Sequence, residues 1–210
     1  MRLLIITSVD AEAKAIGPID GATLVVGGIG RTNAAVATTH AILRDGPFDA
    51  VISAGIAGAL PGGGLKIGDV VVASGCVYVE EGLITPTGFA DMASMGFSLG
   101  DFEGNAVPVD ERLLEILSEH FQIGPIATVA TCSGTDAAAA EVVRRTGAVA
   151  EAMEGAAVVH AARRLNVPAI ELRAISNTTG DRPQQQWNIA AGLASLAAAV
   201  RAAANAIVSA

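Results

Sequence analysis

The sequence predicts an α/β fold with one domain, in which helices flank a central, mostly parallel, mixed and twisted sheet. Short apolar runs alternate with helix-like stretches almost throughout the chain, which is typical of parallel strands joined by crossover helices. A length of 210 residues suits one compact unit, so we expect residues 1–210 to form a single domain. Aromatic residues make up only 3% of the chain, so its core must be built of Ala, Val, Leu and Ile.

The first half of the chain predicts four strands and two helices. Each predicted strand is a continuous apolar run, which suits a strand that is buried on both faces. Each predicted helix follows a polar residue or a glycine turn that can begin it. The strands are expected at residues 2–8, 22–26, 50–53 and 68–74, and the helices at residues 10–16 and 32–43.

The second half continues this alternation after an irregular segment, residues 77–110. That segment mixes Gly, Thr, Pro, Met and Phe without a sustained period, and long connections of this kind are usually functional loops or lids. Beyond it, strands are expected at residues 126–131, 148–151 and 169–175, and helices at residues 110–120, 137–145, 154–166 and 189–210.

Composition argues against several classes of partner. The net charge is −8 and no basic cluster occurs, whereas a protein that binds nucleic acid needs Lys and Arg on one face. Cys76 and Cys132 lack metal spacing and the histidines are scattered, so we expect no metal and a reducing, cytoplasmic context. The first apolar run ends by Val9, which favours a strand over a signal peptide. The Ala-rich run at residues 189–210 suits a packed helix better than a membrane anchor.

The glycine turns do not predict a nucleotide cofactor. Residues 27–33, GGIGRTN, match only part of the dinucleotide fingerprint and follow the second strand rather than the first. Neither a Gly-Lys-Ser/Thr phosphate loop nor a Gly-x-Ser-x-Gly nucleophile turn occurs. We therefore expect no cofactor.

Polar residues at predicted strand ends mark the candidate site. Glu12 follows the first strand, Glu154 begins a helix, Arg173 lies within a strand, and Asn177 lies at that strand's end. Singly, Glu154 could complement a helix dipole, Arg173 could pair with a carboxylate, and Asn177 could be a turn residue. Ligands of open α/β sheets lie outside the carboxyl ends of the strands, so together these residues indicate a site. One acid could activate a water while the other holds sugar hydroxyls.

Four ordered motifs resemble the nucleoside phosphorylase/nucleosidase superfamily, in the branch that contains methylthioadenosine/S-adenosylhomocysteine nucleosidase. The resemblance covers nearly the whole chain and implies that superfamily's fold. The motifs are residues 5–12, residues 54–58 with 65–71, residues 153–157 (MEGAA), and residues 173–176 (RAIS). Within the superfamily, residues 173–182 (RAISNTTGDR) with Trp187 most resemble the futalosine hydrolases.

The resemblance implies hydrolysis of a nucleoside, futalosine, with release of hypoxanthine through an oxocarbenium-like ribosyl transition state. The implied catalytic residues are Glu12, which activates water, Arg173, which orients Glu12 together with Ser176, and Asn177, which stabilises the departing base. The implied substrate-binding residues are Met153 and Glu154 at the ribose, Ser133, Gly134 and Asp136 at the base, Ser176, and Gly55.

This chain departs from the adenine-specific branch at two positions. That branch usually carries Asp, which protonates purine N7, where this chain has Asn177; an amide suits the N7/O6 edge of a 6-oxopurine instead. Asp181 is the alternative source of an acid. Ile56 replaces a Ser near the water and ribose. Arg31 could be offered to a phosphate, but the other phosphate elements of the phosphorylases are missing, which favours water as the nucleophile.

Two alternatives stay open. The protein could be another nucleosidase or a purine nucleoside phosphorylase, or a non-catalytic nucleoside-binding protein on the same fold. By resemblance, residues 77–102 border the 5′ substituent, and a neighbouring subunit completes that pocket, which implies a homo-oligomer of two or more chains. The apolar residues of this segment are Tyr78, Phe89, Met92, Met95 and Phe97.

Overall fold

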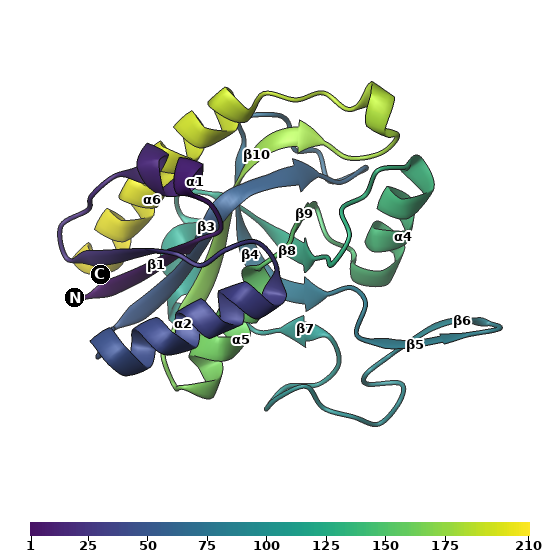
Figure 1. The fold of residues 1–210 in the computed structure, drawn as a ribbon, viewed down its shortest axis with the longest axis horizontal. Coiled ribbons are helices and arrows are strands. Elements are labelled where there is room, and N and C mark those ends of the chain that lie inside the picture. The colour runs from purple at the N-terminus through teal and green to yellow at the C-terminus, as the bar shows by residue number, and fades with distance from the viewer.

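The computed structural model describes residues 1–210, as helices and strands in the alternating order that the sequence predicts (Figure 1). The strands are β1 (Leu3–Thr7), β2 (Ala22–Val26), β3 (Ala50–Ala59), β4 (Val70–Tyr78), β5 (Gly82–Thr85), β6 (Gly88–Asp91), β7 (Ala106–Val107), β8 (Gln122–Thr128), β9 (Ala150–Ala152) and β10 (Ala169–Thr178). The helices are α1 (Asp10–Ile16), α2 (Arg31–Asp45), α3 (Glu111–Ser118), α4 (Asp136–Thr146), α5 (Gly155–Arg164), a 3-10 turn (Arg182–Gln184) and α6 (Ile189–Ser209).

The main sheet closes on itself instead of remaining open. Its strand order is β10-β4-β8-β9-β3-β1-β2, and β10 also pairs with β3, so β3, β10, β4, β8 and β9 form a ring. Most pairs are parallel, whereas β4 meets β10, and β9 meets β3, in antiparallel register. The strand-end argument assumed an open sheet, and the observed sheet differs because β10 pairs with both β3 and β4.

Helices cover the outside of this sheet in two pairs (Figure 1). Helix α1 packs with α6 on one side, and α2 packs with α5 on the other. The core between them is aliphatic, as the composition requires, with residues such as Ile5, Ile52, Leu172 and Leu196 almost inaccessible to solvent. Burying each of these side chains stabilises the folded state by roughly 1.5–3 kcal/mol relative to leaving the side chain exposed.

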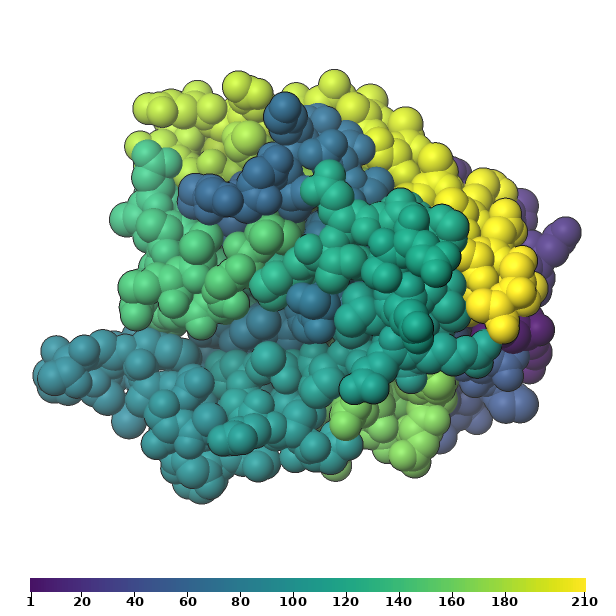
Figure 2. Space-filling view, turned by 180° about the vertical axis from the view of Figure 1, so that it is seen from behind, coloured from purple at the N-terminus to yellow at the C-terminus, as the bar shows by residue number.

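Helix α6 is long and apolar enough to cross a membrane by length and composition alone. It nevertheless lies along the body of the molecule (Figure 2). Its residues Gly192, Leu196, Val200 and Ile207 are buried, and the helix packs on the sheet and on α1. Core helices of globular proteins meet the same criteria, so the criteria do not distinguish a span from this packed helix.

The irregular segment contains a hairpin, β5–β6, that the sequence did not predict. The hairpin and the loop after it project from the body beyond β7 (Figures 1 and 2). Its side chains Leu83 and Ile84 are more than half exposed. Strand β3 is also longer than predicted, because residues 54–58 continue it instead of forming a turn.

Candidate active site

A cavity of about 520 Å³ opens at the carboxyl ends of β1, β3, β9 and β10. Its volume lies within the usual range for small-molecule sites. The predicted residues that line it are Glu12, Ser133, Gly134, Met153, Glu154, Arg173, Ser176 and Asn177. The tertiary fold therefore brings together side chains that are up to 165 positions apart in the sequence, from Glu12 to Asn177.

The Glu12 carboxylate is held by three backbone N–H groups. Its Oε2 accepts from Ser8 at 2.9 Å and from Val9 at 3.2 Å, and its Oε1 accepts from Ile56 at 2.9 Å. The side chain is 3% exposed and faces the cavity. An ionised carboxylate accepts at both oxygens and retains further lone pairs, so this arrangement leaves capacity to accept a proton from a water.

Gly55 makes room for Glu12 and Arg173 to approach one another. A Cβ at position 55 would lie 2.7 Å from Glu12 Oε1 and closer still to Arg173 Nη1. Gly55 itself does not line the cavity, so its part is to allow this approach rather than to contact a ligand. Any larger residue here would separate the carboxylate from the guanidinium.

Arg173 is the centre of a buried charge network. Its Nε donates to Glu171 Oε1 at 2.8 Å, and its Nη2 lies 3.4 Å from Glu154 Oε2. Burial alone would lower the pKa of Arg173, but Glu171, Glu154 and Glu12 together raise the pKa above its usual value. Burial raises the pKa of the Glu171 carboxyl, and Arg173 opposes that rise. The guanidinium is thus a fixed positive charge between carboxylates.

Glu171 is a residue of this network that sequence reasoning missed. It is fully buried, and its carboxyl packs directly on Gly155, the first residue of α5. The Glu-x-Arg spacing in a strand places both side chains on one face, and that spacing was the available signal. Glu171 does not line the cavity, so it acts on the site through Arg173.

The turn at residues 27–30 holds Glu154. The Gly30 N–H donates to Glu154 Oε1 at 2.9 Å, and Gly28 and Gly30 have φ values of +91° and +88° that favour glycine. The Met153 N–H donates to Oε2 at 3.3 Å. The partial dinucleotide motif in the sequence is therefore explained by the positioning of a carboxylate.

A β-bulge in β10 turns two successive side chains into the cavity. The pairing of β10 with β3 shifts register between Ile175 and Asn177, and Ser176 is the extra residue. Side chains normally alternate between the two faces of a strand, but here Ser176 and Asn177 both line the cavity.

The bulge also fixes the orientation of the Asn177 amide. Ser176 Oγ donates to Asn177 Oδ1 at 2.8 Å, so Oδ1 is engaged as an acceptor. Asn177 Nδ2 donates one hydrogen to Thr178 O at 3.0 Å, which leaves its second hydrogen free. Ser176 makes no hydrogen bond with Glu12, so the structure associates it with the amide rather than with the carboxylate expected from the resemblance.

Glu151 is a cavity residue that sequence reasoning also missed. It is 5% exposed; its Oε1 accepts from Ser133 N at 2.7 Å and its Oε2 from Ser133 Oγ at 2.6 Å. Burial raises the pKa of the Glu151 carboxyl, and the two Ser133 bonds oppose that rise. An acid within the apolar run of β9 was the signal that could have identified it.

Asp136 and Asp181 lie outside the cavity, contrary to the expectation that Asp136 lines the base pocket and Asp181 offers an acid. They join two loops instead, since Asp181 N donates to Asp136 Oδ1 and Asp136 N to Asp181 Oδ1, both at 3.0 Å. These bonds fix the start of α4 against the loop that follows β10.

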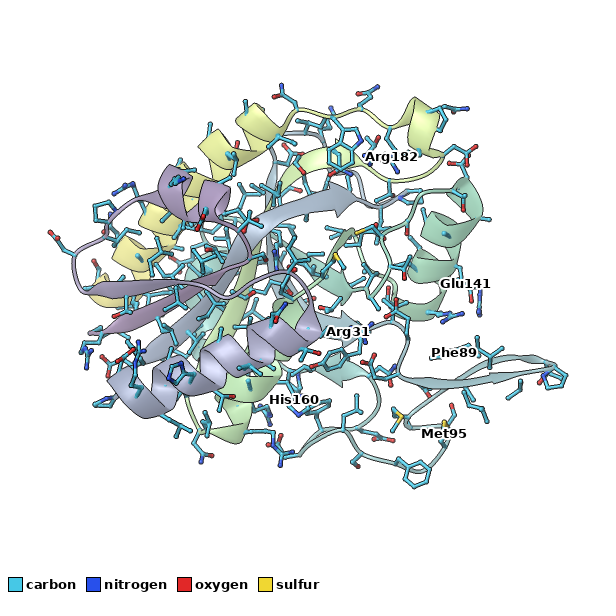
Figure 3. The ribbon with its side chains drawn as sticks, in the orientation of Figure 1. Arg31, Phe89, Met95, Glu141, His160 and Arg182 are labelled. Carbon is cyan, nitrogen blue, oxygen red and sulfur yellow. The ribbon has the colours of Figure 1, made fainter.

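Arg31 also lies outside the cavity. At the start of α2 its guanidinium pairs with Glu80 and Glu81, which neutralise it (Figure 3). Arg31 is therefore not available to a phosphate in this site.

The apolar residues that were expected to border the 5′ substituent do not line the cavity; they are Tyr78, Phe89, Met92, Met95 and Phe97. Phe89 and Met95 lie on the projecting segment (Figure 3).

The loop after β10 forms the outer rim. Arg182 lies there, with its guanidinium 4.5 Å from the centre of the Trp187 ring (Figure 3). The Trp187 indole N–H donates to Gln185 Oε1 at 3.1 Å, and Trp187 pairs as an isolated bridge with Asn177. The rim thus combines an aromatic face with a cation.

A family model described as the phosphorylase superfamily matches residues 16–210. The chain is 38% identical to a futalosine hydrolase of Acidothermus cellulolyticus, covering 92% of this chain and 86% of that one. It is 34% identical to a futalosine hydrolase of Streptomyces coelicolor, covering 95% and 94%. It is 30% identical to a 5′-methylthioadenosine/S-adenosylhomocysteine nucleosidase of Anoxybacillus flavithermus, covering 78% and 72%.

Solved structures agree with the fold. A futalosine hydrolase mutant of Helicobacter pylori superposes with a TM-score of 0.77 at 21% identity, covering 97% of this chain and 98% of that one. The H. pylori 5′-methylthioadenosine/S-adenosylhomocysteine nucleosidase superposes with a TM-score of 0.78 at 19% identity, covering 97% of each chain. Both activities therefore occur on this fold, and similarity of fold alone does not choose between them.

Proposed function

The chain belongs to the phosphorylase superfamily, and we propose that it hydrolyses the N-glycosidic bond of futalosine, releasing hypoxanthine and dehypoxanthine futalosine in the alternative menaquinone pathway. The observation that carries the proposal is the Asn177 amide, which presents a free N–H to the cavity that Glu12 also faces. Purine N7 and O6 of hypoxanthine are both acceptors, so a fixed donor suits them.

Glu12 is the general base of the proposed reaction. It takes a proton from a water whose oxygen attacks the anomeric carbon of the ribose, and the electron pair of the glycosidic bond leaves with the purine. The Asn177 N–H stabilises the negative charge that develops on the leaving base. Because the amide is no proton source, the base acquires its proton from solvent.

Arg173 and Glu154 serve the sugar. Glu154 retains acceptor capacity for vicinal hydroxyls, and Met153 packs beside them at the cavity wall. The buried Arg173 guanidinium places a positive charge 3.4 Å from Glu154 Oε2 and close to Glu12. A positive charge develops on the ribose in the transition state, and the two buried carboxylates of Glu12 and Glu154 stabilise that charge.

Water rather than phosphate is the proposed nucleophile. Phosphate needs a cluster of cationic or N–H donors, whereas Arg31 is neutralised by Glu80 and Glu81, and Arg173 is surrounded by carboxylates. Excess negative charge beside the ribose would repel a phosphate dianion. A phosphorylase is therefore the weaker candidate.

Mass spectrometry of free base tests the proposal. Purified protein is incubated with futalosine, methylthioadenosine and inosine in parallel, with and without phosphate. Hypoxanthine released from futalosine without phosphate is the expected result. Faster release of adenine from methylthioadenosine would assign the chain to the other nucleosidases. A requirement for phosphate would assign it to the phosphorylases. If no base were released from any substrate, the protein would be a non-catalytic nucleoside-binding protein.

We also propose that the protein is a cytoplasmic homo-oligomer. Two free cysteines, one of them exposed, suit a reducing compartment. The hairpin leaves Leu83 and Ile84 exposed, and the loop after it leaves Phe97 exposed. A second copy of the chain is the occupant that would cover them. Light scattering on the purified protein tests this, and a monomer at assay concentration would contradict it.

A further inference from the structure

Three adjacent strands place Asn177 and Glu151 on either side of Gly58. In the sheet register, Asn177 of β10 lies opposite Gly58 of β3, and Gly58 lies opposite Glu151 of β9. A Cβ at position 58 would lie 3.0 Å from Asn177 Nδ2 and 3.7 Å from Glu151 Cγ. The nearest atom to that Cβ would be Thr179 Cγ2, at 2.8 Å. Because residue 58 has no side chain, the Asn177 amide and the Thr179 methyl group can lie over it, with the Glu151 side chain beside them.

The Asn177 amide and the Glu151 carboxylate face one cavity from the two strands that flank β3. Strands two apart in a sheet are separated by about 10 Å between backbones, and the two side chains lean into that space from opposite sides. Asn177, Gly58 and Glu151 all line the cavity. The amide presents a donor, and the carboxylate presents acceptors, along one wall.

Ser133 keeps the Glu151 carboxylate ready to accept. It donates to each carboxylate oxygen, through N–H at 2.7 Å and through Oγ at 2.6 Å. An ionised carboxylate has about four acceptor positions, so these two bonds leave capacity for a ligand. No cation pairs with Glu151, and this buried acid has no part in the proposed chemistry at the ribose.

The edge of a 6-oxopurine carries hydrogen-bonding groups that complement those of Asn177 and Glu151. It carries acceptors at N7 and O6 and a donor at N1–H, whereas a 6-aminopurine carries a donor at N6 and an acceptor at N1. The Asn177 donor and the Glu151 acceptor match the first pattern. If a 6-aminopurine were bound instead, the carboxylate would face the lone pair of its N1 with no hydrogen between them.

We propose that Glu151 is a specificity-determining residue, which accepts the N1–H of a 6-oxopurine and disfavours a 6-aminopurine. This inference rests on the proposed function, because it deepens the recognition of the same leaving base. Asn177 and Glu151 act as a pair on either side of Gly58, and Ser133 fixes the carboxylate.

The test compares the wild type with Glu151→Gln on two substrates, futalosine and its 6-amino-6-deoxy analogue. A hydrogen bond to a charged group is worth roughly a 10- to 100-fold change, so kcat/KM for futalosine should fall by about that factor. The glutamine can donate to the N1 of the amino analogue, so kcat/KM for the analogue should hold or rise. Equal losses on both substrates would overturn the proposal, because they would indicate a merely structural role.

Binding of free bases provides a second readout that does not depend on turnover. Calorimetry of the wild type should show hypoxanthine binding at least about 10-fold more tightly than adenine or 1-methylhypoxanthine, which lacks the N1–H. Glu151→Gln should lose most of that difference. Equal binding of hypoxanthine and 1-methylhypoxanthine to the wild type would overturn the proposal.

The matched control is Glu141→Gln, which changes an exposed carboxyl on α4 outside the cavity. It should leave both kcat/KM values unchanged, and thermal unfolding of each variant checks that the fold persists. Wild-type failure to cleave futalosine would count against the proposed function alone, because the base-binding comparison still decides the part played by Glu151.

Discussion

Gly155→Ala is expected to destabilise the protein although alanine is the better helix former. Gly155 is the first residue of α5, and a Cβ there would lie 1.9–2.0 Å from three atoms of the Glu171 carboxyl. That carboxyl cannot easily move, because it is fully buried and is bonded to Arg173 at 2.8 Å. The methyl group must therefore displace either the helix or the ion pair.

The size of the destabilisation is set by whichever of these two displacements costs less free energy. Overpacking that shifts the backbone costs about 1–3 kcal/mol, whereas breaking a buried ion pair costs about 3–5 kcal/mol. Replacing glycine by alanine in a helix returns at most about 1 kcal/mol. We expect a net loss of about 1–2 kcal/mol in the free energy of unfolding, together with lower kcat/KM because Arg173 shifts.

Urea unfolding followed by circular dichroism measures this change. The control is Gly75→Ala in β4, where the nearest atom to a new Cβ is Val107 O at 3.8 Å, so the change should be small. In a Glu171→Ala background the carboxyl is gone, and Gly155→Ala should then be neutral or stabilising. A Gly155→Ala protein as stable as the wild type would refute the packing of Glu171 on this helix.

Three further predictions concern the site and its surroundings. Glu12→Gln should lower kcat on futalosine by at least about 10²-fold, since the amide cannot take a proton from water. Asn177→Asp should lower kcat/KM for futalosine and raise it for the 6-amino analogue, because an acid can protonate an adenine leaving group. Burial lowers the pKa of His160 below its usual value, so the folded state binds fewer protons than the unfolded state. Its contribution to stability is full above about pH 6.5 and is lost as the pH falls through the lowered folded-state pKa, a loss that His160→Gln should reduce.

Steady-state kinetics test the first two of these predictions, and urea unfolding tests the third. Near-normal turnover by Glu12→Gln would remove that residue from the chemistry. Unchanged preference in Asn177→Asp would mean that position 177 does not read the base. Identical stability–pH curves for the wild type and His160→Gln would show that the imidazole titrates alike in folded and unfolded chains.

Strand ends were the part of the site most accessible to sequence reasoning. The apolar runs set β1 and β10 because only such runs can be buried on both faces, and polar residues directly after them had to lie near the sheet edge. Glu12, Glu154 and Asn177 were found in this way, Arg173 was noted within its strand, and all four line one cavity. Glu151 and Glu171 were missed, because an acid inside an apolar run shows its partners only after folding.

The sequence by itself determined the alternation of elements, the aliphatic core and the choice of an amide at position 177, since these depend on local pattern and residue chemistry. Tertiary structure alone decided that the sheet closes into a ring, that the bulge at Ser176 turns two successive side chains inward, and that Asn177 and Glu151 flank Gly58 at one cavity. The physical reason is that each of these features depends on which strands pair and in which register, and pairing joins residues more than a hundred positions apart.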